Sequence, residues 1–136
     1  MRILFLIVMC LGVAGCGSNT KQASSTASGT IKLDGKPLTS GTLNFYPANE
    51  GNSAFAVINS DGTFTVNTSA GTSGLEPGEY SVVISYEVPS TIDDESNEVP
   101  GINPIPAKFR NEENPEISIT VPKSGTDALS IDLTSQ

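Results

Sequence analysis

The sequence predicts an all-β fold, a sandwich of two antiparallel sheets built from seven strands. Apolar side chains after residue 28 alternate with polar ones in short runs, which places them on one face of a strand. Gly, Pro, Asn and Asp separate the runs, and these residues favour turns. No comparable stretch after the first 15 residues has the 3.6-residue apolar spacing of an amphipathic helix. We therefore expect strands joined by turns and no substantial helix.

The first half of this region supplies four strands. Turn sequences at 34–37 (Asp-Gly-Lys-Pro) and 59–62 (Asn-Ser-Asp-Gly) follow the first and third strands, because Gly and Asp tolerate the backbone of tight turns and Pro fixes φ, and Pro47 ends the second. Each strand is marked by two apolar side chains that we expect to face the core: Ile31 and Leu33, Leu43 and Phe45, Phe55 and Val57, and Phe64 and Val66.

The second half supplies three strands, of which 79–87 has the clearest pattern. Its inward face would hold Tyr80, Val82, Ile84 and Tyr86, and its outward face Ser81, Val83 and Ser85. The last two strands would direct Ile117, Ile119 and Val121, then Leu129, Ile131 and Leu133, into the core. Full burial of a large apolar side chain contributes roughly 1.5–3 kcal/mol, so these inward sets would hold the fold together without disulfides.

A long connection, residues 88–116, interrupts this pattern. It contains five prolines and an acidic run at 93–98 (Asp-Asp-Glu-Ser-Asn-Glu). Connections of this length are unusual in compact domains and are functional or mobile. We expect the middle of this connection to be exposed and poorly ordered, and Phe109 to attach its second half to the edge of the sandwich.

The N-terminus has the pattern of an export signal. Arg2 precedes an uncharged apolar run at 3–11, which is too short to span a bilayer but fits the apolar part of a signal peptide. Val13-Ala14-Gly15-Cys16 follows and resembles the lipobox of bacterial lipoproteins. The resemblance implies a helical signal peptide at 1–15, cleavage before Cys16, and lipidation of Cys16. An ordinary signal peptide with an incidental Cys is the alternative.

This resemblance also predicts the location of the mature chain. Cys10 would leave with the signal peptide, and residues 16–28 would be the acylated Cys followed by a flexible tether without large apolar side chains. Several acyl chains anchor a protein firmly to a membrane. Gly17-Ser18 follows Cys16, with no Asp at the next position, which favours the outer over the inner membrane. We therefore expect a lipoprotein of the cell envelope, facing the periplasm or the cell surface.

Residues 29–136 would form one domain with a recognisable set of turns. These are Gly29-Thr30-Ile31-Lys32-Leu33-Asp34-Gly35-Lys36-Pro37-Leu38, Asp61-Gly62-Thr63-Phe64, Leu75-Glu76-Pro77-Gly78-Glu79-Tyr80 and Ile105-Pro106-Ala107-Lys108-Phe109. Together they resemble the carboxypeptidase regulatory-like (transthyretin-like) domains of small bacterial envelope lipoproteins, over nearly all of 29–133. The resemblance implies a Greek-key, prealbumin-like sandwich with an accessory or structural role. Its motifs are turn-forming rather than reactive.

The composition argues against several classes of activity. The chain has no His, so imidazole-based catalytic and metal sites are absent. It also has no nucleotide-binding glycine motif, and its 15 acidic residues do not identify a catalytic pair. The net charge of −8 disfavours nucleic acid, because phosphate backbones are repelled. We expect neither an enzyme nor a cofactor.

Two binding functions stay open as alternatives. Asp93, Glu95 and Asn97 offer oxygen ligands of the kind that Ca²⁺ prefers, although the spacing does not match an EF-hand and a solvated acidic loop is the simpler interpretation. A carbohydrate module would need exposed aromatic rings, and the chain has no Trp. The candidates are Tyr46, Tyr86 and Phe109, unless these rings only cover the sandwich edges.

The sequence therefore predicts a monomeric, non-enzymatic, lipid-anchored envelope domain with a structural or protein-interaction role. Its contacts would be the membrane, through the anchor, and an envelope protein or polysaccharide. The alternative is a carbohydrate- or calcium-binding envelope module. The sequence itself identifies no ligand-binding residues.

Overall fold

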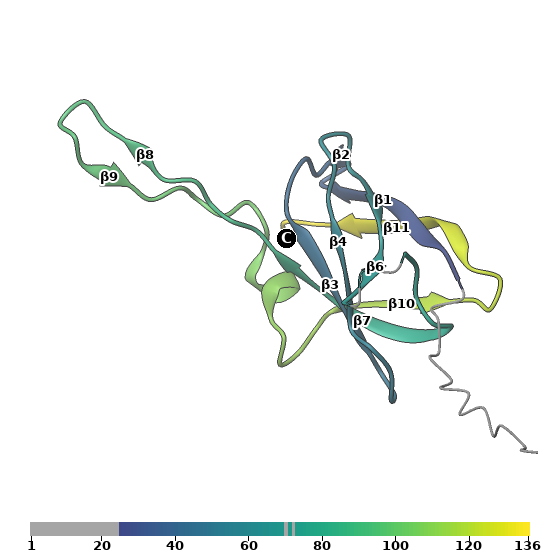
Figure 1. The fold of residues 1–136 in the computed structure, drawn as a ribbon. Helices are drawn as coiled ribbons and strands as arrows, with labels where there is room; N and C mark the ends of the chain where they lie inside the picture. The colour runs from purple at the N-terminus through teal and green to yellow at the C-terminus, as the bar shows by residue number, and fades with distance from the viewer. Residues whose placement is uncertain (1–24, 70, 72) are drawn as a thin grey trace, which may run out of the picture.

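A computed structural model describes residues 25–69, 71 and 73–136 (Figure 1). The predicted signal peptide, Cys10, Cys16 and the first part of the tether lie outside the described residues. The described chain is an all-β sandwich, as the sequence predicts. Its two sheets pack across one core, where the rings of Phe45 and Phe64, one from each sheet, lie 6.3 Å apart between centroids.

The smaller sheet is built around the first strand. β1 (Ala27–Leu33) pairs with β2 (Lys36–Pro37) through a turn at Asp34-Gly35, within the predicted turn sequence 34–37. It also pairs with β5 (Thr63–Thr65) and with the last strand, β11 (Thr126–Leu133). The β1–β11 pair is parallel, which differs from the antiparallel expectation. The preceding strand of the chain belongs to the other sheet, so no hairpin dictates the direction of β11.

The larger sheet is antiparallel throughout. Its strand order is β10 (Ile117–Val121), β7 (Gly78–Ser85), β3 (Thr42–Pro47), β4 (Ala54–Val57) and β6 (Asn67–Thr68). β7 lies between β3 and β10, and its inward side chains Tyr80, Val82 and Ile84 are buried as predicted. Val83, on the opposite face, is buried as well.

Most of the predicted core is confirmed. Eleven of the predicted inward side chains are buried, and the partly buried Leu33, Tyr86, Ile117, Ile119 and Leu129 pack against them.

The prediction for β4 is wrong, because Phe55 and Val57 point outward and are 39% and 59% exposed. Ala54 and Ala56 face the core instead, opposite Phe45 and Leu43 of β3. Small side chains fit beside these two large ones. Both faces of β4 are apolar, so alternation alone could not orient the strand.

The fold begins before the predicted domain boundary at residue 29. Ser25 is buried, forms a bridge with Leu75, and donates a hydrogen bond from Oγ to the carbonyl of Lys123 at 3.1 Å. Ala27 begins β1 and is also buried. The last four residues of the predicted tether therefore belong to the sandwich, with the small side chains of Ser25 and Ala27 buried in it.

The connection at 88–116 contains a hairpin that projects from the sandwich (Figure 1). β8 (Thr91–Ile92) pairs with β9 (Glu98–Val99), and residues 89–102 are exposed. We call residues 88–104 the arm. The predicted exposure of the arm is confirmed. The predicted poor order is wrong, because β8 and β9 pair with each other. A short 3₁₀ helix, η1 (Ala107–Arg110), follows and buries Phe109, which confirms the predicted attachment.

Candidate functional site

The arm is attached to the sandwich at its base. Asn103 Nδ2 donates to the carbonyl of Tyr86 at 3.4 Å, and the Ile105 N–H donates to Asn103 Oδ1 at 2.9 Å. Ile105 itself is buried in the core. A Cβ at Gly101 would stand 2.3 Å from Val88 Cγ1, so the two legs of the arm lie in close contact there. The arm is thus held in a defined direction.

The tip of the arm is closed by Asp93. Its Oδ1 accepts hydrogen bonds from the N–H groups of Glu95 at 3.0 Å and Asn97 at 2.8 Å, and its Oδ2 accepts from Asn97 Nδ2 at 3.3 Å. The bond from the Asn97 N–H is the largest of the causes that lower the pKa of Asp93. Ser96 adopts a left-handed φ of 64° to complete the turn.

These contacts give the calcium candidates a structural role. Asp93 and Asn97 meet as partners within the turn, and the contact of Glu95 with Asp93 is made by its backbone N–H. Within the described ranges, no three His, Cys, Asp or Glu side chains are placed to hold a metal ion together.

Exposed apolar side chains gather in two places. In the described part of the chain, six large apolar side chains are exposed, and all lie on the arm or on the outer face of the larger sheet. On the arm, Ile102 is 92% exposed and Ile92 is 76% exposed. The remaining members are Val99 on the arm and Tyr46, Phe55 and Val57 on β3 and β4. Grouped exposed apolar side chains are typical of interaction surfaces.

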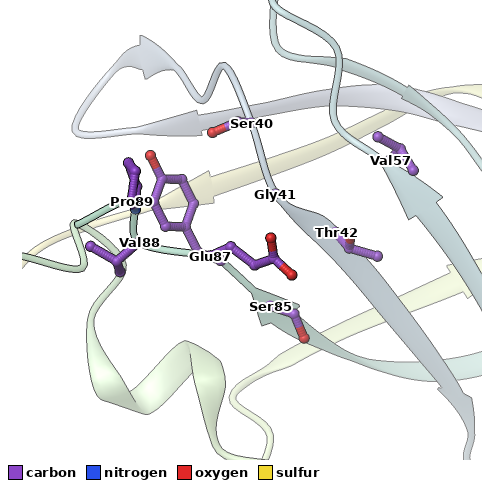
Figure 2. A pocket seen from close by; sticks show the side chains of 9 residues that line it. Ser40, Gly41, Thr42, Val57, Ser85, Glu87, Val88 and Pro89 are labelled. Carbon is purple, nitrogen blue, oxygen red and sulfur yellow. The ribbon is translucent and has the colours of Figure 1, made fainter. Parts of the chain in front are cut away.

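A cavity of about 640 Å³ joins these two regions, and we call it the root cavity (Figure 2). It lies where the chain leaves β7 to begin the arm. The sheet register places Val57, Thr42 and Ser85 side by side on its floor. The lining is completed by Ser40, Gly41, Tyr86, Glu87, Val88 and Pro89.

The polar groups of the root cavity are mostly free to bind a ligand. In Figure 2 the Glu87 side chain extends toward the strands that bear Thr42 and Ser85. Among the described residues, the side-chain oxygens of Ser40, Thr42 and Glu87 have no hydrogen-bond partner, whereas Ser85 Oγ accepts from Asn44 Nδ2 at 2.9 Å. The cavity therefore offers hydroxyl groups and one carboxylate, together with apolar side chains on both sides.

The charge of this region is entirely negative. Residues 37–107 include the whole arm and every residue that lines the root cavity, and this stretch contains no Lys or Arg. It contains nine acidic residues: Glu50, Asp61, Glu76, Glu79, Glu87, Asp93, Asp94, Glu95 and Glu98. The next cations along the chain are engaged locally, because Lys108 donates to the Gln136 carbonyl and Arg110 to the Ile105 carbonyl.

The aromatic candidates are placed differently from one another. Tyr46 is exposed as predicted, and its hydroxyl donates to Glu112 Oε1 at 3.2 Å. Partial burial and the nearby Glu112 carboxylate raise the pKa of Tyr46. Tyr86 is half-buried in the root cavity, and Phe109 is buried and offers no binding platform.

Phe55 was missed by sequence reasoning because it was assigned to the core. It joins Tyr46 and Asn44 around a second hollow of about 200 Å³ on the outer face.

Neither the described fold nor comparison with other proteins supplies a function directly. No protein-family model, curated protein or solved structure matches this chain. In the part of the chain that the structure describes, no helix has the length and apolar character needed to cross a membrane.

Proposed function

We propose that this protein is a non-enzymatic, lipid-anchored component of the cell envelope whose sandwich presents the arm to another envelope protein. The exposure of Ile92 and Ile102 on a projecting hairpin is the observation that supports this proposal. When a partner covers apolar side chains, the free energy of the complex falls by about 25 cal/mol per Å² of apolar surface removed from water. Tethering at the base limits the entropy lost when the arm is bound.

The anchor in this proposal is Cys16. Its support is the apolar run 3–11 followed by Val-Ala-Gly-Cys. The turn sequences that resemble carboxypeptidase regulatory-like domains support an accessory sandwich of that kind, with Greek-key connections. Metabolic labelling with a radioactive fatty acid tests the anchor. The intact chain should become labelled and Cys16→Ser should not, whereas equal labelling of both would refute lipidation at this residue.

The described carboxyl groups support a non-enzymatic role. The aspartates with a lowered pKa are Asp34, Asp61 and Asp93, and each is exposed and accepts hydrogen bonds from backbone N–H groups, those of Asp61 and Asp93 within their own turns. None of the three lines the root cavity. A general acid at neutral pH instead needs a raised carboxyl pKa.

Photo-cross-linking in the native envelope tests the role of the arm. Benzoylphenylalanine is placed at Ile92 or Ile102 on the arm, and at Thr120, which is exposed on β10, as the control. We expect one protein adduct from both arm positions and not from the control. The absence of an adduct, or the same adduct from Thr120, would contradict the proposal.

A polysaccharide-binding role is the second candidate, and the pair of exposed rings beside the smaller hollow favours it. Tyr46 and Phe55 could stack on sugar rings, with Asn44 as a hydrogen-bonding neighbour. Affinity electrophoresis of the full chain in gels containing envelope polysaccharide tests it. Retardation should be lost in Tyr46→Ala with Phe55→Ala. Unretarded migration of the unchanged protein would exclude this candidate for the polysaccharides used.

A further inference from the structure

We infer that the root cavity binds a lysine side chain of the protein that the arm contacts. The inference rests on the proposed interaction function and adds the chemistry of the partner. It combines two independent observations: a cavity with unpartnered oxygen acceptors, and a surrounding stretch without a positive charge.

The acceptors suit an ammonium group. Lysine carries three N–H donors and no acceptor, so its head needs oxygen atoms on several sides. The Glu87 carboxylate supplies the opposite charge, and the hydroxyls of Ser40 and Thr42, which also line the cavity, supply further acceptors. These three side chains have no hydrogen-bond partner among the described residues, so binding a ligand breaks no existing bond.

The remaining lining suits the rest of a lysine. Val57 on one side of the cavity and Val88 and Pro89 on the other offer apolar contacts for the methylene groups of the side chain. Tyr86 adds an aromatic ring, and ammonium groups are attracted to ring faces. A volume of about 640 Å³ falls within the usual range of ligand pockets and leaves room for the neighbouring backbone of the partner.

Arginine fits this acceptor set less well. A guanidinium favours planar, two-point contact with a carboxylate, whereas an ammonium is a compact point charge with rotatable donors. The cavity offers one carboxylate and hydroxyls from separate residues, which matches the second arrangement.

Charge complementarity selects the same kind of partner. Glu87 and the four acidic residues of the arm generate a negative field on this side of the molecule, which attracts a basic protein and repels carboxylates and phosphates. A second copy of this chain, with a net charge of −8, is repelled too. The occupant is therefore a lysine-bearing segment of a different, basic protein.

An NMR titration tests the inference on the ¹⁵N-labelled full chain in neutral detergent micelles. The probe is acetyl-Ala-Lys-Ala-amide, whose single charge limits general attraction to the acidic arm. We expect amide shifts centred on Gly41, Thr42, Ser85 and Glu87. The acetyl-lysine version of the peptide, which keeps the shape but loses the charge, should give no such shifts.

Substitution of Glu87 provides the matched comparison. Glu87→Gln should raise the peptide concentration at half-saturation about tenfold, equivalent to about 1.4 kcal/mol. Glu113→Gln, an exposed acid outside the cavity lining, should leave it unchanged. Because Glu87 is exposed, its variant should keep the thermal melting curve of the unchanged chain.

Several results would overturn the inference. These are shifts spread evenly over the acidic residues, equal binding of the acetyl-lysine peptide, equal effects of the two glutamine variants, or saturation of the same amides by a neutral oligosaccharide in preference to the lysine peptide. The two proposals fail separately. Arm cross-links without lysine binding would reject only the cavity inference. Lysine binding without arm cross-links would reject the interaction function and the identity of the lysine donor, and would leave the cavity as a lysine site.

Discussion

Asp61 illustrates how single residues set the turns of this protein. Its Oδ1 accepts hydrogen bonds from the Thr63 N–H at 3.0 Å and the Thr63 hydroxyl at 2.6 Å. Asp34 similarly accepts from the Ser135 N–H at 2.9 Å. The Asp-Gly turns were predictable because their conformation is a local property of two residues. The contact with Ser135 was not, because it joins residues 101 positions apart.

These bonds make stability depend on pH. The bonds from Thr63 hold the pKa of Asp61 below its ordinary value. The ionised form therefore stabilises the fold above the unfolded-state pKa of about 4, and this contribution disappears as the pH falls through the folded-state pKa. Asp61→Asn should have a lower melting temperature than the unchanged chain at pH 7, and the difference between the two melting temperatures should shrink toward pH 2.5.

Melting temperatures measured by circular dichroism across this pH range check the prediction. Asp127→Asn, at an exposed position of β11, is the control and should show a smaller difference at pH 7. A constant difference for Asp61→Asn at every pH would contradict the assignment.

At the scale of elements, strand positions were more predictable than strand orientation. Period-2 alternation located β7 and its inward face, because large apolar residues are confined to one side of most of its length. In β4 the outward pair is larger than the inward alanines, and the choice depends on the space left by Phe45 and Leu43. That space depends on the side chains of β3, so it cannot be predicted from the sequence pattern of β4 alone.

The arm and the root cavity were less predictable. Acidic residues and prolines indicated exposure correctly, but the strand pairing in the arm covers only two residues on each leg. Such a short run has no detectable period. The root cavity combines residues near 40, 57 and 85–89, which only the register of β3, β4 and β7 brings together.

The buried Phe109 and the exposed Ile102 of the arm should respond differently when their side chains are shortened to alanine. Phe109→Ala removes a ring that is 8% exposed and should lower the free energy of unfolding by about 3–5 kcal/mol. Ile102→Ala, at a position that is 92% exposed, should change it by less than about 0.5 kcal/mol. Urea denaturation followed by circular dichroism measures both. Similar losses for the two variants would contradict the described burial.

For the whole molecule, the parallel pair of β1 and β11 joins the beginning and the end of the described sandwich. Gly29 lies opposite Leu129 in this pair, where an added Cβ would stand 2.1 Å from the Leu129 carbonyl oxygen. Only glycine permits this approach. The buried Ile31 of β1 and the buried Ile131 of β11 then meet in register.

Gly29→Ala should therefore destabilise the entire fold rather than one strand. Overpacking costs about 1–3 kcal/mol, and here the backbone itself must shift. Equilibrium urea denaturation should show an earlier midpoint with a single transition. Gly51→Ala is the matched control, since that glycine is exposed and its nearest neighbour would be Pro47 Cβ at 3.3 Å. Equal midpoints for the two variants would contradict the close approach.

The direction of β1 and β11 also has a mechanical consequence. Because the strands are parallel, a pull on the chain before Ala27 and a pull on the chain after Leu133 act on opposite ends of the pair. Such a load shears the strands, so that the inter-strand hydrogen bonds must break together rather than one after another. A load applied between the N-terminal side of β1 and the C-terminal end of β11 would therefore meet this shear geometry rather than unzip the pair.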